Sequence, residues 1–220
     1  MPEASGHPFD RFLQALWKAS PQDPSVVFDP WNRRSDDDIH AEAWEGRRER
    51  LRRHLAAPNV RVVIVGEAPG ARGARVSGVA FTSERLIQQG AIPRLGAASG
   101  RLSTRRLPWS EASATIMWGA LYKEGLAEDT VMWNAYPWHP HPPGLPHKNR
   151  RPSPAERTHG LAHLEALMRC VPGAVAVAVG EDAKQSLMDI GVPARAIRHP
   201  SYGGATVFRE QLARLAAELR

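Results

Sequence analysis

Four short runs of apolar, mostly β-branched residues alternate with stretches of helical periodicity, and this alternation limits the folds open to the chain. The runs lie at residues 60–65, 130–133, 174–179 and 196–198. Helices are expected at residues 110–124, 154–169, 182–190 and 206–219. Strands that alternate with helices pair in parallel, and the helices cover both faces of the sheet. We therefore predict an α/β fold, a three-layer α/β/α domain with a central four-stranded parallel sheet.

The N-terminal quarter is expected to be a helical extension of that domain. Residues 8–20 carry apolar side chains at helical spacing, and residues 36–56 begin with three aspartates and end rich in arginine, as the helix dipole favours. We expect this extension, residues 1–58, to pack on the sheet, so that residues 1–220 form a single domain. The arginine run is interpreted as a solvated helix face, with DNA contact as the alternative.

Composition limits the partners and cofactors. The chain has 29 Lys and Arg against 23 Asp and Glu, a formal net charge of +6, which suits a polyanion but is explained equally well by arginine-rich compositional bias. Cys170 is the only cysteine, so an internal disulfide and a cluster held by several thiolates are both excluded. Neither a signal sequence nor a membrane-spanning apolar run is recognisable, and we expect a cytoplasmic protein without membrane contact.

The residues that follow the predicted strands are the most informative, because ligands bind at the carboxyl ends of the strands in an open parallel sheet. The four runs are followed in turn by Gly66-Glu67-Ala68-Pro69-Gly70, Asn134, Gly180-Glu181-Asp182 and His199-Pro200-Ser201-Tyr202. Each piece has an ordinary structural reading, as a tight turn, a strand-end amide or a turn histidine. Together they bring an acid, an amide and an imidazole to one edge, which predicts a catalytic site.

Five sequence pieces in order resemble the uracil-DNA glycosylase superfamily over most of residues 60–219. They are GEAPG at 66–70, GVAF at 78–81, Asn134, a PPG and NRRP stretch that ends at Glu156, and HPS at 199–201. Five pieces in the correct order are far more specific than any one of them. The resemblance is strongest to the GEAPG branch, which is best known from enzymes that carry an iron–sulfur cluster.

The resemblance implies that the enzyme flips uracil out of DNA and hydrolyses its N-glycosidic bond. Glu67 would activate the attacking water, Asn134 would bond the edge of the base, and His199 would stabilise negative charge on the departing uracil. Phe81 would stack on the base, with a core aromatic as the alternative reading. The base pocket would also be lined by Gly66, Ala68, Pro69 and Gly70.

DNA is expected to contact a basic loop and the segment that follows His199. Both are suited to phosphates, although the basic loop has a solvated surface loop as its alternative reading. The residues assigned to DNA are Lys148, Asn149, Arg150, Arg151, Pro200, Ser201, Tyr202 and Gly203. A wedge that fills the space of the flipped base would be Tyr202 or come from the arginine-rich segment 83–109, a long loop expected to be functional or mobile.

The chain departs from this branch where the cluster ligands would lie. Trp138 and Gly160 stand in place of ligand cysteines, so we expect no iron–sulfur cluster, no other cofactor and no metal. Packing by Trp138 and neighbouring aromatic residues is our hypothesis for what replaces the cluster. The histidines of the proline-rich stretch, His139, His141 and His147, lack a carboxylate or thiolate partner nearby and are interpreted as loop histidines.

Two further departures concern the first motif. The acids that follow it in the family are absent from residues 71–75, which leaves Glu67 as the only candidate base. Gly70 lacks the bulk with which some relatives exclude the methyl group of thymine.

Together these features predict a monofunctional uracil-DNA glycosylase that acts as a monomer on uracil in single- or double-stranded DNA. A broader glycosylase that also excises hypoxanthine, xanthine or mismatched thymine is the first alternative. A module that binds uracil or abasic DNA without turnover is the second. A nucleotide-binding protein without a DNA role is disfavoured, because the chain has no phosphate-binding loop or dinucleotide fingerprint.

Overall fold

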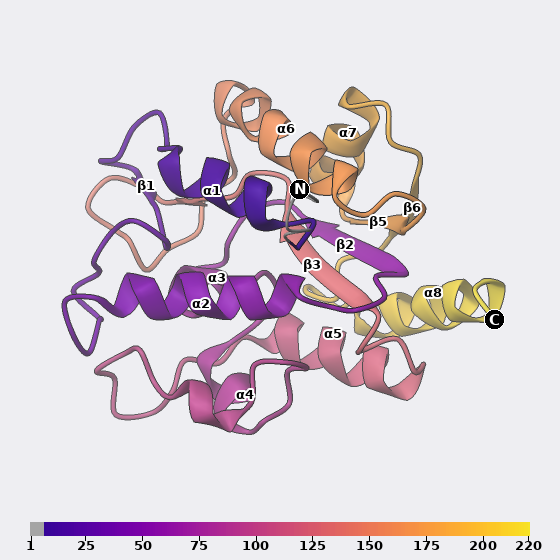
Figure 1. Cartoon of the computed structure of the whole chain (residues 1–220), viewed down its shortest axis with the longest axis horizontal. Coiled ribbons are helices and arrows are strands. Elements are labelled where there is room, and N and C mark those ends of the chain that lie inside the picture. The colour runs from indigo at the N-terminus through magenta and orange to yellow at the C-terminus, as the bar shows by residue number, and fades with distance from the viewer. Residues whose placement is uncertain (1–6) are drawn as a thin grey trace, which may run out of the picture.

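The computed structural model of the chain describes residues 7–220 and is built around a central sheet of four parallel strands (Figure 1). The strands are β2 (Val62–Gly66), β3 (Thr130–Asn134), β5 (Val175–Val179) and β6 (Ala194–Ile197), in the order β3-β2-β5-β6. The predicted fold class is confirmed. Strand β6 begins two residues earlier than expected, because it is an edge strand with Arg195 and Ala196 exposed, so apolarity does not mark its start.

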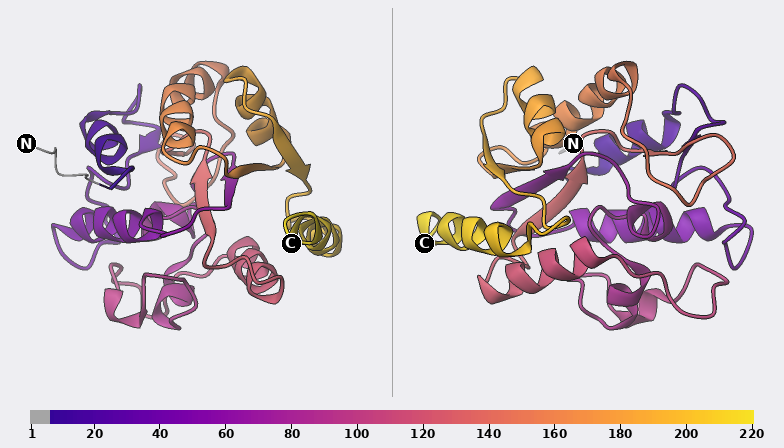
Figure 2. Two further views of the ribbon diagram at one scale, coloured as in Figure 1. Left: turned by 45° about the vertical axis from the view of Figure 1, so that its right-hand side comes forward. Right: turned by 180° about the vertical axis from the view of Figure 1, so that it is seen from behind.

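Helices cover both faces of the sheet, which explains why its central strands are continuous apolar runs. Val62 and Ile64 face the layer formed by α5 (Ala112–Lys123) and α8 (Ala205–Glu218). Val63 and Val65 face the layer formed by α1 (Asp10–Lys18), α2 (Ala43–Leu55), α6 (Pro154–Arg169) and α7 (Glu181–Asp189). Figure 2 shows the sheet between these layers. None of the helices within residues 7–220 is long and apolar enough to cross a membrane.

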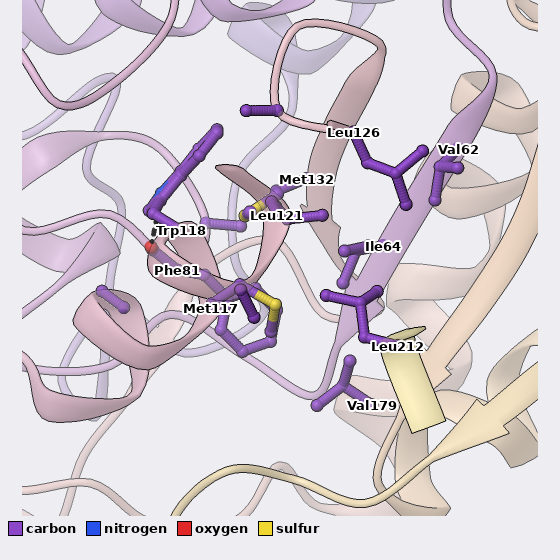
Figure 3. Close-up of a cluster of buried hydrophobic side chains, with 14 of the residues drawn as sticks. Val62, Ile64, Phe81, Met117, Trp118, Leu121, Leu126, Met132, Val179 and Leu212 are labelled. Carbon is purple, nitrogen blue, oxygen red and sulfur yellow. Dashed lines mark hydrogen bonds between the residues drawn. The ribbon is translucent and has the colours of Figure 1, made fainter. Parts of the chain in front are cut away.

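The core on the α5 side also supports the segment that carries Phe81. Met117, Trp118 and Leu121 of α5 pack with Ile64 and Phe81 in one buried cluster (Figure 3). The indole Nε1 of Trp118 donates a hydrogen bond of 3.1 Å to the backbone oxygen of Phe81. A core helix therefore holds in place a residue that the sequence assigns to the base pocket.

The N-terminal extension packs on the second layer and on the long loops. Helix α1 contacts α6, and its Phe12, Leu13 and Leu16 lie in the same cluster as the sheet residue Val63. The short strand β1 (Val27–Phe28) pairs antiparallel with β4 (His139–Pro140), which follows the loop after β3. The N-terminal segment thus braces the loops at the carboxyl edge of the sheet.

The predicted helix 36–56 is wrong in its first turns, since α2 begins only at Ala43. Asp38 does not serve the helix dipole. It accepts a hydrogen bond of 2.8 Å from the Ser35 amide and one of 2.6 Å from Arg47, and its backbone bridges to Ser103. The aspartates therefore shape a turn and a buried ion pair.

The interpretation of the arginine run as a solvated face is also wrong in part. Arg47 and Arg50 are buried, at 0% and 2% exposure, and Arg50 donates a 2.7 Å hydrogen bond to the Gly100 carbonyl. Arg48 is half-buried, and Arg52 and Arg53 are exposed and both pair with Glu49. The pattern of charges does not distinguish these positions, because a buried arginine requires acceptors that the chain supplies from distant segments.

The arginine-rich segment 83–109 is more ordered than the predicted long loop. It contains α4 (Glu84–Gln88) and η1 (Ala97–Ser99), and it follows the short helix α3 (Ala74–Ser77). The fully buried carboxylate of Glu84 accepts hydrogen bonds from the Leu102 and Ser103 amides, at 2.9 and 3.0 Å. The guanidinium of Arg94 bonds the carbonyl oxygens of neighbouring segments. Several polar residues of the segment therefore have structural partners.

Candidate active site

The carboxyl edge of the sheet opens into one cavity of about 670 Å³. The chain passes from β2 to the edge strand β3 and then returns to β5 on the other side, so the loops after the strands diverge above β2 and β5. The predicted residues that line the cavity are Glu67, Ala68, Gly70, Phe81, Asn134, Asn149, Arg150, Arg151, His199, Ser201 and Tyr202. Five others, Gly66, Pro69, Lys148, Pro200 and Gly203, belong to the same loops without lining it.

Gly66 brings Phe81 and Asn134 together because it has no side chain. A Cβ atom there would lie 2.6 Å from Cζ of Phe81 and 2.9 Å from Oδ1 of Asn134, closer than real Cβ contacts allow. Gly66 and Asn134 are register partners at the ends of β2 and β3. The Ala135 amide donates to the Gly66 carbonyl at 2.8 Å, which joins the two strand ends. Asn134 is 6% exposed, and it lines the cavity beside Phe81.

Phe81 belongs to the buried core and also lines the cavity. Its two interpretations, as a core aromatic and as a residue that stacks on the base, are therefore compatible. Its φ angle of +48° is in the left-handed region, which is rare for a residue with a side chain and costs about 1 kcal/mol or more. The bond from Trp118 to its carbonyl helps hold that conformation. The ring lies 6.1 Å from the ring of His199, centroid to centroid, at an angle of 40°.

Glu67 forms a charged cluster with Asp182 and Arg151. Arg151 Nε lies 3.9 Å from Oε1 of Glu67 and 2.7 Å from Oδ2 of Asp182. Burial, a hydrogen bond with Asp182 and the negative charge of Asp182 together raise the pKa of Glu67 to about 7, although Arg151 and Arg157 partly oppose them. The hydrogen bond from Arg151 lowers the pKa of Asp182. The shared proton therefore resides on Glu67, while Asp182 stays ionised.

Asp182 is a residue to which the sequence assigned no role, although it stands at the end of the third strand. It lies in the first turn of α7, a helix that begins directly after Gly180, whose φ of +92° turns the chain out of β5. The position on the edge was visible in the sequence, but its contact with Glu67 joins segments far apart in the chain.

His199 is held in one tautomer by its own loop. The Ser201 amide donates a 3.1 Å hydrogen bond to Nδ1, so in the neutral imidazole the proton lies on Nε2. Burial, with a lesser effect of Arg198, lowers the pKa of His199, which favours the neutral form. Gly204 permits this loop, because a Cβ there would overlap the His199 carbonyl oxygen. His199 can therefore donate one hydrogen bond from Nε2 while remaining neutral.

The predicted basic loop is partly engaged within the protein. Asn149 Oδ1 accepts a 2.8 Å hydrogen bond from the Ala71 amide and so secures the loop after β2. Arg150 forms two hydrogen bonds of 2.6 Å to Glu156, and Arg151 pairs with Asp182. Lys148 is exposed. Glu156 has a second role, because it also forms the capping box of α6 with Ser153. The salt bridge to Arg150 therefore joins the basic loop to the start of α6.

The residues present do not fit an iron–sulfur cluster. Trp138 is fully buried and packs against Tyr136, His159 and His163, with ring centroids 5.1 to 5.5 Å apart. A Cβ atom at Gly160 would overlap the Ala135 backbone oxygen, so a cysteine side chain has no room there. This packing agrees with the hypothesis that aromatic residues occupy the cluster's place. No group of three metal-ligating side chains occurs in the part of the chain that the structure describes.

Comparisons with known proteins agree with this architecture. The uracil DNA glycosylase superfamily matches residues 53–216 of the chain. Among solved structures, the crystal structure of wild-type Pedobacter heparinus SMUG2 is similar with a TM-score of 0.66. The match has 16% sequence identity and covers 96% of each chain, and at that identity it supports the fold alone. No curated protein matches the sequence.

Proposed function

Since the chain belongs to the uracil DNA glycosylase superfamily, we propose that it hydrolyses the N-glycosidic bond of a flipped uracil in DNA and leaves an abasic site. The observation that carries the proposal is the convergence of Glu67, Phe81, Asn134 and His199 on one cavity at the carboxyl edge of the sheet. A base inside a duplex is out of reach, so such a cavity requires that the nucleotide be flipped into it.

Uracil is recognised by its ring face and by one edge. The ring stacks on Phe81, and the Asn134 amide bonds the edge formed by N3–H and O4, since an amide offers an acceptor and a donor side by side. Cytosine presents the reverse pattern at these two atoms. Because Asn134 is nearly buried where it lines the cavity, cytosine would leave the amide and its own edge unpaired.

The reaction breaks the bond between C1′ and N1 and adds water to C1′. The bonding electron pair leaves with uracil, where negative charge accumulates on N1 and O2, and Nε2–H of His199 donates a hydrogen bond to O2. The ionised form of Glu67 orients the attacking water and accepts its proton, while its charge favours the cationic sugar. A neutral histidine and a carboxyl with a pKa near 7 are suited to these roles.

DNA approaches the cavity along the exposed loop residues. Tyr202 is 98% exposed, has a φ of +52° and lies at the cavity, three residues after His199. It is the better candidate for the wedge than the segment 83–109, whose structure depends on internal contacts around Glu84.

We further propose that the protein acts as a cytoplasmic monomer.

A glycosylase of broader scope is the second candidate, because a cavity of about 670 Å³ also has room for a purine. Side-by-side excision of uracil, hypoxanthine, xanthine and guanine-paired thymine separates the two candidates. Activity confined to uracil would exclude the broader one.

The central test compares Asn134→Ala, His199→Ala and Glu67→Gln with the wild type on a uracil-containing oligonucleotide. We expect single-turnover rates to fall by about a hundredfold or more for the first two variants, as when a transition-state donor is lost. Asn59→Ala and His40→Ala, which change the same residue types at exposed positions, should retain the wild-type rate. If all three site variants release uracil as fast as the wild type, the assignment of the site is wrong.

A further inference from the structure

The carboxyl group of Glu111 occupies the wall of the cavity beside the loop that follows β2. Glu111 immediately precedes α5 and lines the cavity together with Gly70 and Ala71. A Cβ atom built on Gly70 would overlap Oε1 of Glu111, and one built on Gly73 would overlap both carboxyl oxygens. The side chain of Glu111 therefore fills the space that side chains at residues 70 and 73 would otherwise fill.

This carboxyl group has no protein partner to explain its position. Within residues 7–220 it takes part in no hydrogen bond and no ion pair, unlike Glu67, Glu84 and Glu156. Burial alone raises the pKa of Glu111 to about 7. Glu111 is half-buried and faces the cavity, so an acid with a raised pKa and no protein partner in that wall calls for a role toward the ligand.

The proposed orientation of uracil shows which ring atom meets this wall. Asn134 takes the edge of N3 and C4, and His199 takes O2, which is attached to C2. In a pyrimidine, C5 lies across the ring from C2, so C5 points away from His199. The glycine loop and Glu111 line a part of the cavity that neither Asn134 nor His199 occupies.

We propose that Glu111 is a specificity-determining residue that closes the base pocket at C5 and excludes the 5-methyl group of thymine. The inference rests on the proposed function. Gly70 leaves this side of the pocket without bulk of its own, and the carboxyl group from the start of α5 supplies it. A methyl group would both overlap the carboxyl oxygens and bury them against an apolar surface, which raises the free energy of binding for thymine.

The test measures the ratio of excision rates for uracil and thymine, each opposite guanine in the same duplex. Glu111→Ala should raise the thymine rate relative to the uracil rate by about tenfold or more, the range expected for one methyl group in a pocket. Glu111→Gln keeps the volume and should keep the wild-type ratio. Glu111→Asp keeps the charge but withdraws it by one methylene, and it should relax the ratio part of the way.

A compensating change adds a stricter check. Gly70 is not in the left-handed region, so alanine is compatible with its backbone once the carboxyl group is gone. The double variant Glu111→Ala, Gly70→Ala should therefore recover part of the discrimination that Glu111→Ala loses. Glu124→Ala, which removes a glutamate from the other end of α5 and its 3.6 Å contact with Arg220, controls for general effects on the helix.

The outcomes separate failure of the inference from failure of the proposed function. An unchanged ratio in a folded Glu111→Ala variant overturns the inference. Loss of uracil excision in both the Ala and Gln variants also overturns it, because Glu111 would then be required for the reaction itself. If the wild type releases no uracil, the proposed function fails. Fluorescence anisotropy on the same two oligonucleotides then decides the inference, which requires that Glu111→Ala bind thymine-containing DNA more tightly.

Discussion

The proton on Glu67 is controlled by two neighbours with opposite effects. Burial and Asp182 raise the pKa of Glu67, whereas Arg151 lowers it from 3.9 Å away. With a pKa of about 7, only about half of the Glu67 carboxyls are ionised at neutral pH. Because the proposed base acts in its ionised form, activity should rise with pH through a midpoint near 7.

Asp182 is thus a positioning residue, and Asp182→Asn tests its effect. The substitution removes a negative charge beside Glu67 and releases Arg151 to approach it, so the pKa of Glu67 falls. The acidic limb of the pH–rate profile should move to lower pH, but not to the value of a free carboxyl, because burial remains. Single-turnover rates measured across pH 5 to 9 show the shift.

The control for this shift is Glu181→Gln, which removes a carboxylate from the same helical turn. Its side chain is 86% exposed and lies 3.6 Å from Lys184. It should leave the midpoint unchanged. Equal profiles for Asp182→Asn and the wild type would show that Asp182 does not control the proton on Glu67.

At the level of elements, the glycines of α6 and α5 differ in what surrounds them. Gly160 of α6 lies against the backbone that follows β3, where a Cβ would overlap the Ala135 oxygen and lie 3.1 Å from the Tyr136 Cα atom. Gly119 of α5 is exposed, and nothing lies within 4 Å of a Cβ built there. The first glycine permits close packing of a helix on the loop beside Asn134, and the second has no such function.

Alanine substitutions at these two positions should have opposite effects on the free energy of unfolding. Gly119→Ala should stabilise the protein by about 0.5 to 1 kcal/mol, through helix propensity alone. Gly160→Ala should destabilise it by about 1 to 3 kcal/mol, because backbone must move to relieve the overlap. Urea denaturation followed by circular dichroism measures both. Stabilisation by Gly160→Ala would show that α6 can retreat from the loop without cost.

The sequence predicts elements well where local chemistry decides them. Helix α6 has the predicted bounds, 154–169, because Ser153, Pro154 and Glu156 mark its start. Strands β2 and β3 are mostly apolar and buried throughout because both faces of the sheet are covered. The start of α2 was wrong because Asp38 finds its partner in Arg47, across a turn that no local pattern specifies.

Parts of the site could not be predicted because they depend on contacts between segments far apart in the chain, which no local pattern specifies. Glu67, Asn134 and His199 stand directly after strands, so their meeting at one edge follows from the topology. Asp182 was placed on that edge, but its effect on Glu67 depends on side-chain distances. Glu111 stands before a helix that no motif marks, and its approach to Gly70 is visible only once the loops are packed.

At the scale of the whole molecule, the net charge of +6 overstates the charge available to DNA. Arg47 and Arg50 are buried, and Arg150 is paired with Glu156. Near the cavity, Lys148 and Arg72 are exposed cations without an ion pair in the described structure. Salt-dependent affinity should therefore depend on a few loop residues rather than on the overall charge.

A salt titration of DNA affinity tests this distribution. Each lysine or arginine that neutralises a phosphate steepens the plot of log affinity against log salt concentration by about one unit. Lys148→Ala and Arg72→Ala should each make that slope shallower by about one. Lys123→Ala, which removes an exposed positive charge at the far end of α5 from the cavity, should leave it unchanged. If all three substitutions reduce the slope equally, the DNA interface is not centred on the cavity, because overall charge would then govern binding.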